Sequence, residues 1–315
     1  MKSSERYELK LPKKVFPIHS PKKLAGLLSI PLKDLQELSE RVGISYNPFS
    51  KKVGGKERIF DNPIGFLKEV QRRIHKYILR DIIFPDFVIG GIKNKDPLKH
   101  PSSHIKKTVI VTMDVKDCYP SVTNKHIYAV WYEQLKCSPP VSHLATKLTT
   151  INGHLPLGAS TSTYLANLAL LPCATISAQI AKKLGFTFTQ HIDDFAFSGA
   201  SSPEKLITSV IKEFSKNGFR MNRSKLEIMR SGSSQRVTKK IVNKKVSIPM
   251  SERSKVRSAL HRLKNAEVTS LGYSASYRSV KGKIAHLKKF HLKCGSKMQK
   301  VLEHLKKPRK TTQIK

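Results

Sequence analysis

Three aspartates stand where the sequence predicts the ends of buried strands. Asp114 ends the β-branched run TVIVTMD, and Asp193 and Asp194 stand side by side at a turn in QHIDDFAFSG. Such a carboxylate is costly unless it binds something positive, and adjacent carboxylates repel, so Mg²⁺ is a natural partner. Two such ions, about 3.5–4 Å apart, activate an attacking hydroxyl and stabilise a leaving pyrophosphate. An Asp-Asp pair alone is equally typical of simple turn chemistry, but the strand-borne Asp114 favours the metal site.

The charge of the chain indicates the class of partner. Lys and Arg number 59 against 22 Asp and Glu, a formal net charge of +37 over 315 residues. Self-repulsion of this size is tolerated most easily beside a polyanion. Nucleic acid is the leading candidate, ahead of an anionic membrane surface. Charge alone is also compatible with a basic protein of ribosomal type that has no enzymatic activity.

The cysteines and the apolar stretches of the sequence indicate the cellular compartment in which we expect the protein. Cys118, Cys137, Cys173 and Cys294 are widely spaced and form no CxxC pair, which predicts buried, reduced thiols rather than a zinc site. The start of the chain has no apolar run of signal-peptide length, and we find no stretch of about 18 or more apolar residues. We therefore expect a cytoplasmic protein without a membrane span.

Periodicity and turn residues predict an α+β chain. A helical lead-in precedes a basic hairpin over 51–61 with its turn at Gly54-Gly55, and an amphipathic helix over 64–83 precedes a strand over 108–115. The second half contains a break at Pro139-Pro140, a long helix after the loop LPLGAST, a hairpin over 186–199, an amphipathic helix over 202–218, strands over 226–230 and 240–248, and basic helices from 251 onward.

Three strings resemble reverse transcriptase motifs in order and spacing. DVKDCYPSV resembles motif A, LPLGASTSTYLANL resembles the motif B pattern LPQGxPTSPxLANL, and HIDDFAFSG is similar to the YxDD motif C. The resemblance covers about 40–265 and implies a right-hand polymerase with an antiparallel palm sheet. The division implied is a helical N-terminal lead-in over 1–50, fingers over 51–107, palm with finger insertions over 108–248, and a basic helical thumb and tail over 249–315.

The resemblance also implies roles for individual residues. Asp114, Asp193 and Asp194 would be catalytic and would hold two Mg²⁺ ions, which Mn²⁺ could replace, with the Val115 backbone as a further ligand. The residues that would bind the incoming nucleotide are Lys56 and Arg58 of the hairpin, Tyr119 as a steric gate against a ribose 2′-OH, Gly158 and Ser162 of motif B, and Lys225 of the motif D-like FRMNRSKLEIM. The plainer alternatives are palm packing for Tyr119, a solvated basic hairpin, and an ordinary surface lysine at position 225.

Residues of the last quarter are implied to bind nucleic acid. From Arg236 onward there are 23 Lys and Arg against 3 Glu. The nucleic-acid-binding residues implied are His191, beside the aspartate pair, and Arg253, Arg257, Arg262 and Lys264. Three aromatic residues interleave with the basic ones and either stack on bases or pack the thumb, with core packing favoured for the last: Tyr273, Tyr277 and Phe290.

Within the family, the chain resembles bacterial retron reverse transcriptases. His104 stands ten residues before Asp114, at the place of the histidine in the retron NAxxH element, and VTK resembles the retron VTG. The resemblance implies RNA-directed synthesis of multicopy single-stranded DNA from dNTPs, on a cognate structured non-coding RNA that also supplies a priming 2′-OH. It also implies anti-phage defence together with an effector protein.

The chain departs from the family pattern at four places. His191 replaces the YxDD tyrosine, Leu157 the motif B glutamine, Lys239 the VTG glycine, and His100-Pro101 the Asn-Ala of NAxxH. The departures leave the carboxylates intact and put the retron subfamily in question. The alternatives are another bacterial defence reverse transcriptase with a different RNA or protein priming, and a catalytically inactive RNA-binding scaffold.

Overall fold

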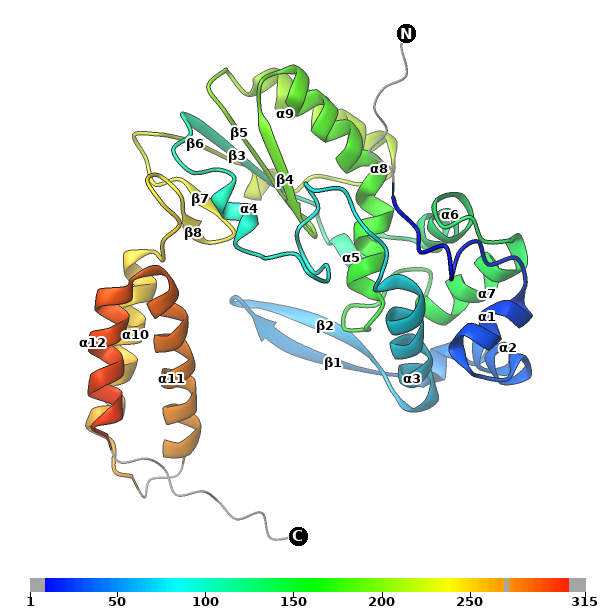
Figure 1. Ribbon diagram of the computed structural model, residues 1–315, viewed down its shortest axis with the longest axis horizontal. Coiled ribbons are helices and arrows are strands. Elements are labelled where there is room, and N and C mark those ends of the chain that lie inside the picture. Colours follow the sequence, from blue (N-terminus) through cyan, green and yellow to red (C-terminus); the bar gives the residue numbers. More distant parts are fainter. Residues whose placement is uncertain (1–8, 269–271, 306–315) are drawn as a thin grey trace.

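A four-stranded antiparallel sheet forms the middle of the molecule, as Figure 1 shows. The computed structural model describes residues 9–268 and 272–305, so the predicted tail over 306–315 lies outside the described residues. The strand order is β4-β5-β3-β6. The strands are β3 (Val109–Asp114), β4 (Thr187–His191), β5 (Asp194–Gly199) and β6 (Glu227–Arg230). The predicted α+β class and antiparallel sheet are confirmed.

Helices cover the sheet because their apolar faces need burial. The long helix α8 (Ser162–Lys183) packs against β4 and against α9 (Glu204–Lys216). Around this core lie the shorter helices α4 (Lys99–Ser102), α5 (Cys118–Ser121), α6 (Asn124–Ala129), η3 (Val130–Gln134), α7 (Pro139–Thr149) and η4 (Arg223–Lys225). The expected break at Pro139-Pro140 is the first turn of α7, where proline fits because its missing N–H has no helical partner.

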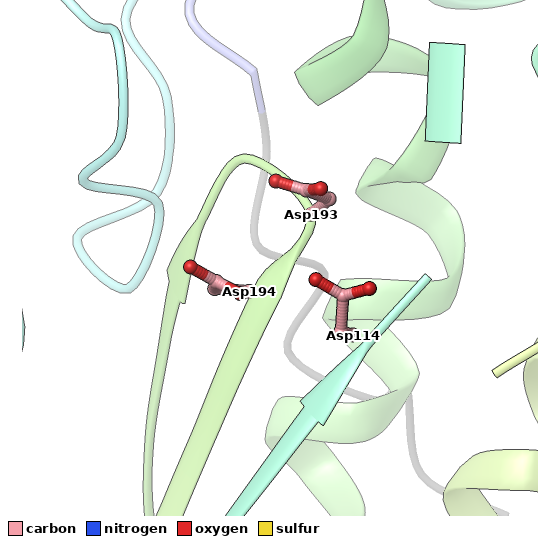
Figure 2. Close-up of side chains that lie close together, drawn as sticks. All are labelled: Asp114, Asp193 and Asp194. Carbon is pink, nitrogen blue, oxygen red and sulfur yellow. The ribbon is translucent and has the colours of Figure 1, made fainter. Parts of the chain in front are cut away.

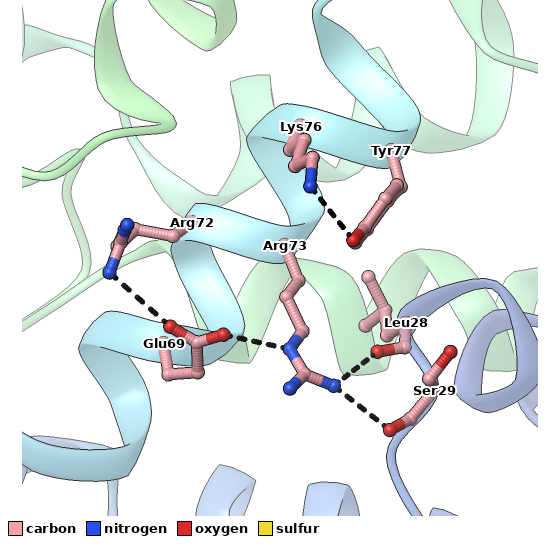
Figure 3. Close-up of polar contacts among 7 residues, drawn as sticks. All are labelled: Leu28, Ser29, Glu69, Arg72, Arg73, Lys76 and Tyr77. Carbon is pink, nitrogen blue, oxygen red and sulfur yellow. Dashed lines mark hydrogen bonds and ion pairs between the residues drawn. The ribbon is translucent and has the colours of Figure 1, made fainter.

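The N-terminal helices, which share the main hydrophobic core with the sheet, also receive hydrogen bonds from one guanidinium. They are α1 (Pro21–Leu28), α2 (Leu32–Glu40) and η1 (Val42–Ser45). Arg73 lies on α3 (Gly65–Ile74), which continues as the π-helical turn η2 (His75–Leu79). The Arg73 Nη1 donates to the carbonyl oxygens of Leu28 and Ser29 at 2.9 Å each, and Nε donates to Glu69 at 2.8 Å (Figure 3). These bonds satisfy carbonyls that the end of α1 leaves unpaired.

The basic hairpin is longer than the sequence predicts. Strands β1 (Tyr46–Val53) and β2 (Lys56–Pro63) pair around Gly54-Gly55, whose φ angles of 61° and 84° suit glycine. The hairpin therefore begins inside the stretch assigned to the helical lead-in. Tyr46 extends it because its ring is buried and its hydroxyl accepts a 2.8 Å hydrogen bond from Gln71 Nε2.

The predicted strand over 240–248 forms only at its first two residues. Only β7 (Arg236–Val237) and β8 (Lys240–Ile241) form, and the chain bends at 243–245. The bend follows from Asn243, whose side chain accepts a bond from the Gln235 N–H at 2.9 Å and donates to the Ser233 carbonyl at 2.7 Å. An Asn side chain that bonds nearby backbone competes with strand pairing in this way.

The C-terminal helices form a bundle with its own core, which stands to one side of the sheet (Figure 1). They are α10 (Met250–Lys264), α11 (Tyr273–Phe290) and α12 (Leu292–Glu303). Tyr273 and Tyr277 are buried in this core and Phe290 packs on it, so all three rings serve packing. The bundle core is separate from the main core under the sheet.

Among the residues that the structure describes, one helix is long and apolar enough to cross a membrane, contrary to the expectation that no such stretch exists. It is α8, of 22 residues, and 72% of its apolar window is buried inside the protein. Its neighbours β4 and α9 supply that burial, so α8 is a core helix and no membrane span is indicated. The four cysteines are free thiols, and Cys118, Cys137 and Cys173 are buried, as predicted.

Candidate active site

The register of two strands brings the three aspartates together. Asp114 at the end of β3 is paired with Asp194 at the start of β5, and Asp193 lies in the preceding turn. The Val115 N–H donates to the Asp193 carbonyl at 3.2 Å, which fixes the turn against β3. One carboxylate oxygen from each aspartate lies within 4.8 Å of the others, and Figure 2 shows Asp114 facing the turn.

The turn is strained at Ile192. Its φ is 61°, in the left-handed region that a β-branched side chain rarely occupies. The surrounding bonds hold it there, because the Ile192 carbonyl accepts a 2.9 Å bond from the Gln190 side chain. Strain of this kind is concentrated at functional sites, where neighbouring structure imposes a geometry that the chain would not choose alone.

Burial and mutual repulsion disfavour three charges here. Burial, with the Asp114 charge second, raises the pKa of Asp193. Burial and both neighbouring carboxylates raise the pKa of Asp194 to about 7. Lys225 offsets part of the charge, since its Nζ donates to Asp114 Oδ2 at 2.7 Å. A cluster of carboxylate oxygens that retains excess negative charge fits a divalent cation, so these three residues could hold a metal ion.

A cleft of about 270 Å³ adjoins the aspartates and gathers three of the predicted nucleotide-binding residues, Arg58, Tyr119 and Lys225. Val115, the predicted backbone ligand, and Leu157 of motif B also line it. The Tyr119 hydroxyl lies 3.4 Å from Thr163 Oγ1, which limits how the ring can turn. The hairpin thus brings Arg58 across the cleft from the sheet. Lys56 begins β2, and its side chain lies outside the described part of the structure.

The motif B loop is hydrogen-bonded to the hairpin beside the cleft. The Asp61 N–H donates to the Leu157 carbonyl at 2.9 Å. Gly158 has a φ of 119° and lies beside Phe60, a conformation that favours glycine. Ser162 is buried at the start of α8 and does not line the cleft, so its contact with a nucleotide stays a prediction.

A second cavity, of about 500 Å³, opens on the other side of the aspartates. Asp114, Asp194 and Lys225 line it together with His100 of α4 and, on α10, Ser251, Glu252 and Lys255. The predicted nucleic-acid-binding residues of α10 do not line this cavity: Arg253, Arg257, Arg262 and Lys264. Arg253 is half-buried. Lys255 of the same helix, which was not predicted, does line the cavity. His191 ends β4 opposite Asp194.

Sequence reasoning missed the segment that supports the turn from behind. Gln190 of β4 donates its N–H to the Phe87 carbonyl at 2.7 Å and accepts at its own carbonyl from Ile89 at 2.9 Å. Gly90 packs so closely that an added Cβ would lie 2.6 Å from the Ile192 nitrogen. The only signal in the sequence is the pair Gly90-Gly91.

Comparison with known proteins agrees with this architecture. Residues 50–275 match the family of reverse transcriptases (RNA-dependent DNA polymerases). The match covers more than half of the chain, so the chain belongs to that family.

The relatives define the resemblance further. The chain is 30% identical over 201 residues to the retron Se72 reverse transcriptase of Salmonella heidelberg (strain 579083-10), covering 62% of this chain and 52% of the relative. It is 27% identical over 257 residues to the retron Mx65 reverse transcriptase of Myxococcus xanthus, covering 76% and 59%. The chain therefore spans less than two thirds of these relatives. The predicted resemblance to bacterial retron reverse transcriptases is confirmed.

Two further comparisons are more distant. The retron Ec48 reverse transcriptase of Escherichia coli is 22% identical over 300 residues, covering 86% of this chain and 72% of the relative. A solved telomerase structure from Candida albicans, in complex with a telomeric RNA fragment, aligns with 85% of this chain and 59% of its own at 10% identity and a TM-score of 0.46.

We predict that Gly90→Ala weakens metal binding. The added Cβ meets backbone of the Asp193 turn, which cannot rotate away, so the turn must shift. Displacing the support behind a metal ligand weakens affinity by about tenfold or more, which titration calorimetry with Mn²⁺ would measure. Gly232→Ala is the control, since its Cβ would meet open space. Equal affinity in the two variants would contradict the supporting role of Gly90.

We predict that Asp194 stabilises the metal-free protein at low pH and that this contribution is lost as the pH rises from about 4 to about 7, where its folded pKa lies. The raised pKa means that the folded state holds this proton more tightly than the unfolded state, so the contribution is fully present below the unfolded pKa and falls through this window. In EDTA, the difference in Tm between Asp194→Asn and wild type should therefore shift in favour of the variant between pH 5 and pH 8. Mg²⁺ should raise the wild-type Tm more at pH 8 than at pH 5, because binding must displace the proton. Parallel pH profiles for both proteins would contradict this prediction.

Proposed function

We propose that this protein is an RNA-directed DNA polymerase whose catalytic residues are Asp114, Asp193 and Asp194. The observation that carries the proposal is the convergence of their oxygens within 4.8 Å at the palm sheet of a chain in the reverse transcriptase family. Bound divalent ions, with Mg²⁺ first and Mn²⁺ as a substitute, would activate the attacking hydroxyl and stabilise the leaving pyrophosphate. The Val115 backbone, which lines the same cleft, would complete the ligand set.

Residues in and around the cleft would bind and select the nucleotide and hold the nucleic acid. Arg58 and Lys56 of the hairpin attract the triphosphate, with Gly158 and Ser162 shaping the floor beneath it. Tyr119, held beside Thr163, excludes a ribose 2′-OH by steric contact. The Lys225 ammonium, 2.7 Å from Asp114, is placed to neutralise or protonate the pyrophosphate as it leaves. His191, Arg253, Arg257, Arg262 and Lys264 hold template and product.

The arrangement supports a division into fingers, palm and thumb. The fingers comprise the hairpin and following helices to residue 107, the palm spans 108–248, and the thumb begins at 249. The start of β1 at Tyr46 moves the first finger residue ahead of the predicted boundary at 51.

We propose further that the enzyme copies a cognate structured non-coding RNA into multicopy single-stranded DNA primed from an RNA 2′-OH. The similarity to three retron reverse transcriptases supports this reading. The partners would be that RNA, the RNA–DNA product, dNTPs and an effector protein, acting in anti-phage defence in the cytoplasm. The replaced residues His100, His191 and Lys239 favour one alternative, a bacterial defence reverse transcriptase that uses another RNA or protein priming.

We expect that cells expressing the gene with its upstream DNA accumulate small, RNase-resistant DNA joined to RNA. The double variant Asp193→Asn with Asp194→Asn should yield none, and Asp34→Asn, an exposed aspartate of α2, should behave as wild type. Gel electrophoresis before and after RNase treatment reads the product. Persistence of the DNA in the double variant would refute the site.

Purified protein separates the remaining alternatives. No branched DNA in cells, together with primer extension on an RNA template in vitro, would indicate the non-retron reverse transcriptase. RNA binding without any dNTP incorporation would indicate the inactive scaffold.

We predict that Tyr119→Ala raises incorporation of ribonucleotides relative to deoxyribonucleotides by about tenfold or more, because one contact in a pocket discriminates on that scale. Tyr119→Phe should keep the wild-type ratio, since it retains the ring and loses only the hydroxyl beside Thr163. Competition of rNTP and dNTP in single-turnover extension measures the ratio. An unchanged ratio in Tyr119→Ala would mean that Tyr119 only packs the palm.

A further inference from the structure

Four buried polar side chains form a continuous hydrogen-bonded chain behind the aspartates. His104 Nδ1 lies 2.7 Å from the Ser198 hydroxyl of β5, and His104 Nε2 lies 2.7 Å from the Thr189 hydroxyl of β4. The Thr189 hydroxyl is also 2.6 Å from His100 Nδ1. All four residues are at most 5% exposed. The chain therefore joins α4 and the loop after it to the two strands that carry the Asp193 turn.

The direction of donation along this chain follows from Ser198. Among the described residues, its hydroxyl has one hydrogen-bond partner, His104 Nδ1. A proton on Nδ1 would leave the buried hydroxyl hydrogen without an acceptor, which is costly. Ser198 therefore donates to His104, whose own proton is on Nε2 and goes to Thr189. The Thr189 hydroxyl then donates to His100 Nδ1, so His100 carries its proton on Nε2.

Both imidazoles are neutral in this arrangement. Burial is the main cause, and it lowers the pKa of His104 to about 3 and that of His100 to about 2. The positive charge of Lys107 acts in the same direction on the pKa of His104, and any proton on His104 or His191 would act in the same direction on the pKa of His100. A neutral ring that accepts at Nδ1 can only donate at Nε2.

His100 lines the 500 Å³ cavity that also contains Asp114, Asp194 and Lys225. Of the four ring nitrogens of His100 and His104, only His100 Nε2 has no hydrogen-bond partner among the residues the structure describes. Asp114 and Lys225 line both this cavity and the cleft with Arg58 and Tyr119. A nucleotide in the cleft and a strand end in the cavity would thus meet at Asp114.

Two of the four places where this chain departs from its family pattern line the same cavity, and a third lies beside it. His100 replaces the asparagine of NAxxH and Lys239 the glycine of VTG, and both line the cavity. His191, which replaces the YxDD tyrosine, has its ring 5.7 Å from the His100 ring. Three replacements that are far apart in sequence therefore lie at or next to one cavity, which indicates that this cavity makes a contact particular to this enzyme.

We propose that His100 donates a hydrogen bond from Nε2 to an oxygen of the sugar–phosphate backbone of the nucleic-acid strand whose end reaches Asp114 and Asp194. Ser198, His104 and Thr189 are positioning residues, because they fix the proton on Nε2 and never touch the strand. The proposal rests on the proposed polymerase function for the identity of the ligand. A neutral donor suits this place because it holds the strand without adding to the charge around the aspartates.

The proton positions can be read directly in the wild-type protein. In ¹⁵N-histidine-labelled protein, long-range ¹H–¹⁵N correlation spectra distinguish the two neutral tautomers. We expect His100 and His104 to be neutral and protonated on Nε2, with their signals assigned from His100→Gln and His104→Gln. Protonation on Nδ1 in either ring would overturn the proposal.

Binding tests the contact itself. The probe is a fluorescein-labelled RNA–DNA hybrid with a recessed 3′ end, titrated by anisotropy in EDTA without nucleotide. His100→Leu should bind about three- to tenfold more weakly, the range of one neutral hydrogen bond. His100→Gln, whose amide N–H can replace Nε2–H, should recover most of the affinity. Equal binding by wild type and His100→Leu would overturn the proposal.

Salt dependence separates this contact from a charged one. The slope of log Kd against log salt should be the same for His100→Leu and wild type, because a neutral donor releases no counterion. Lys239→Ala in the same cavity should lower the slope by about one for a lost phosphate contact. A lowered slope in His100→Leu would show a cationic contact and refute the neutral donor.

Ser198→Ala tests the positioning role without changing His100, so a folding defect in the His100 variants would not affect this test. Ser198 lies at the far end of the chain and does not line the cavity. Its loss should give mixed tautomers at His100 and weaken binding about twofold to threefold, less than His100→Leu does. A single Nε2–H tautomer with unchanged binding would overturn the positioning role. Because no step requires catalysis, a protein that binds through His100 yet incorporates no dNTP would refute the polymerase proposal and leave this one standing.

Discussion

Repulsion among three carboxylates crowded at the ends of two strands is the constraint on which the rest of this structure depends. Asp114 and Asp194 are placed opposite each other by strand register, and Asp193 is placed by a turn that runs through a strained isoleucine. The positions of Asp193 and Asp194 disfavour a negative charge, because burial and the neighbouring carboxylates raise the pKa values of both side chains. The surrounding protein must therefore hold the turn by other means.

Those means come from distant parts of the chain. The segment around Gly90 continues the hydrogen bonding of β4 behind the turn, and Gln190 fixes the Ile192 carbonyl. The histidine chain from Ser198 to His100 joins the back of β4 and β5 to α4. The hairpin reaches across the front and bonds the motif B loop through Asp61 and Leu157. The site is thus rigid at its back and lined by long, flexible cationic side chains at its front, an arrangement suited to a large polyanionic ligand.

Local patterns explain which parts of this arrangement were predictable. The β-branched run before Asp114, the Gly54-Gly55 turn and the apolar stretches around Asp193-Asp194 each predicted an element that the structure contains. Bonds between distant residues left no such pattern. His100 and Thr189 are 89 positions apart, and nothing in either neighbourhood indicates their contact. The strand predicted over 240–248 shows the opposite case, in which the side chain of Asn243 bonds nearby backbone and the strand ends after Ile241.

The apolar helix α8 is exposed to solvent before the fold is complete. Its 22 residues precede β4, β5 and α9 in the chain, and these later elements cover it in the finished protein. During synthesis the segment leaves the ribosome before its covering partners do. Until those partners have also left the ribosome, the nascent chain exposes a helix with the length and composition of a membrane anchor, and for that interval it is vulnerable to mistargeting and aggregation. The core of the fold thus carries a transient risk during its biosynthesis that ends only when the strand bearing the aspartate pair has also left the ribosome.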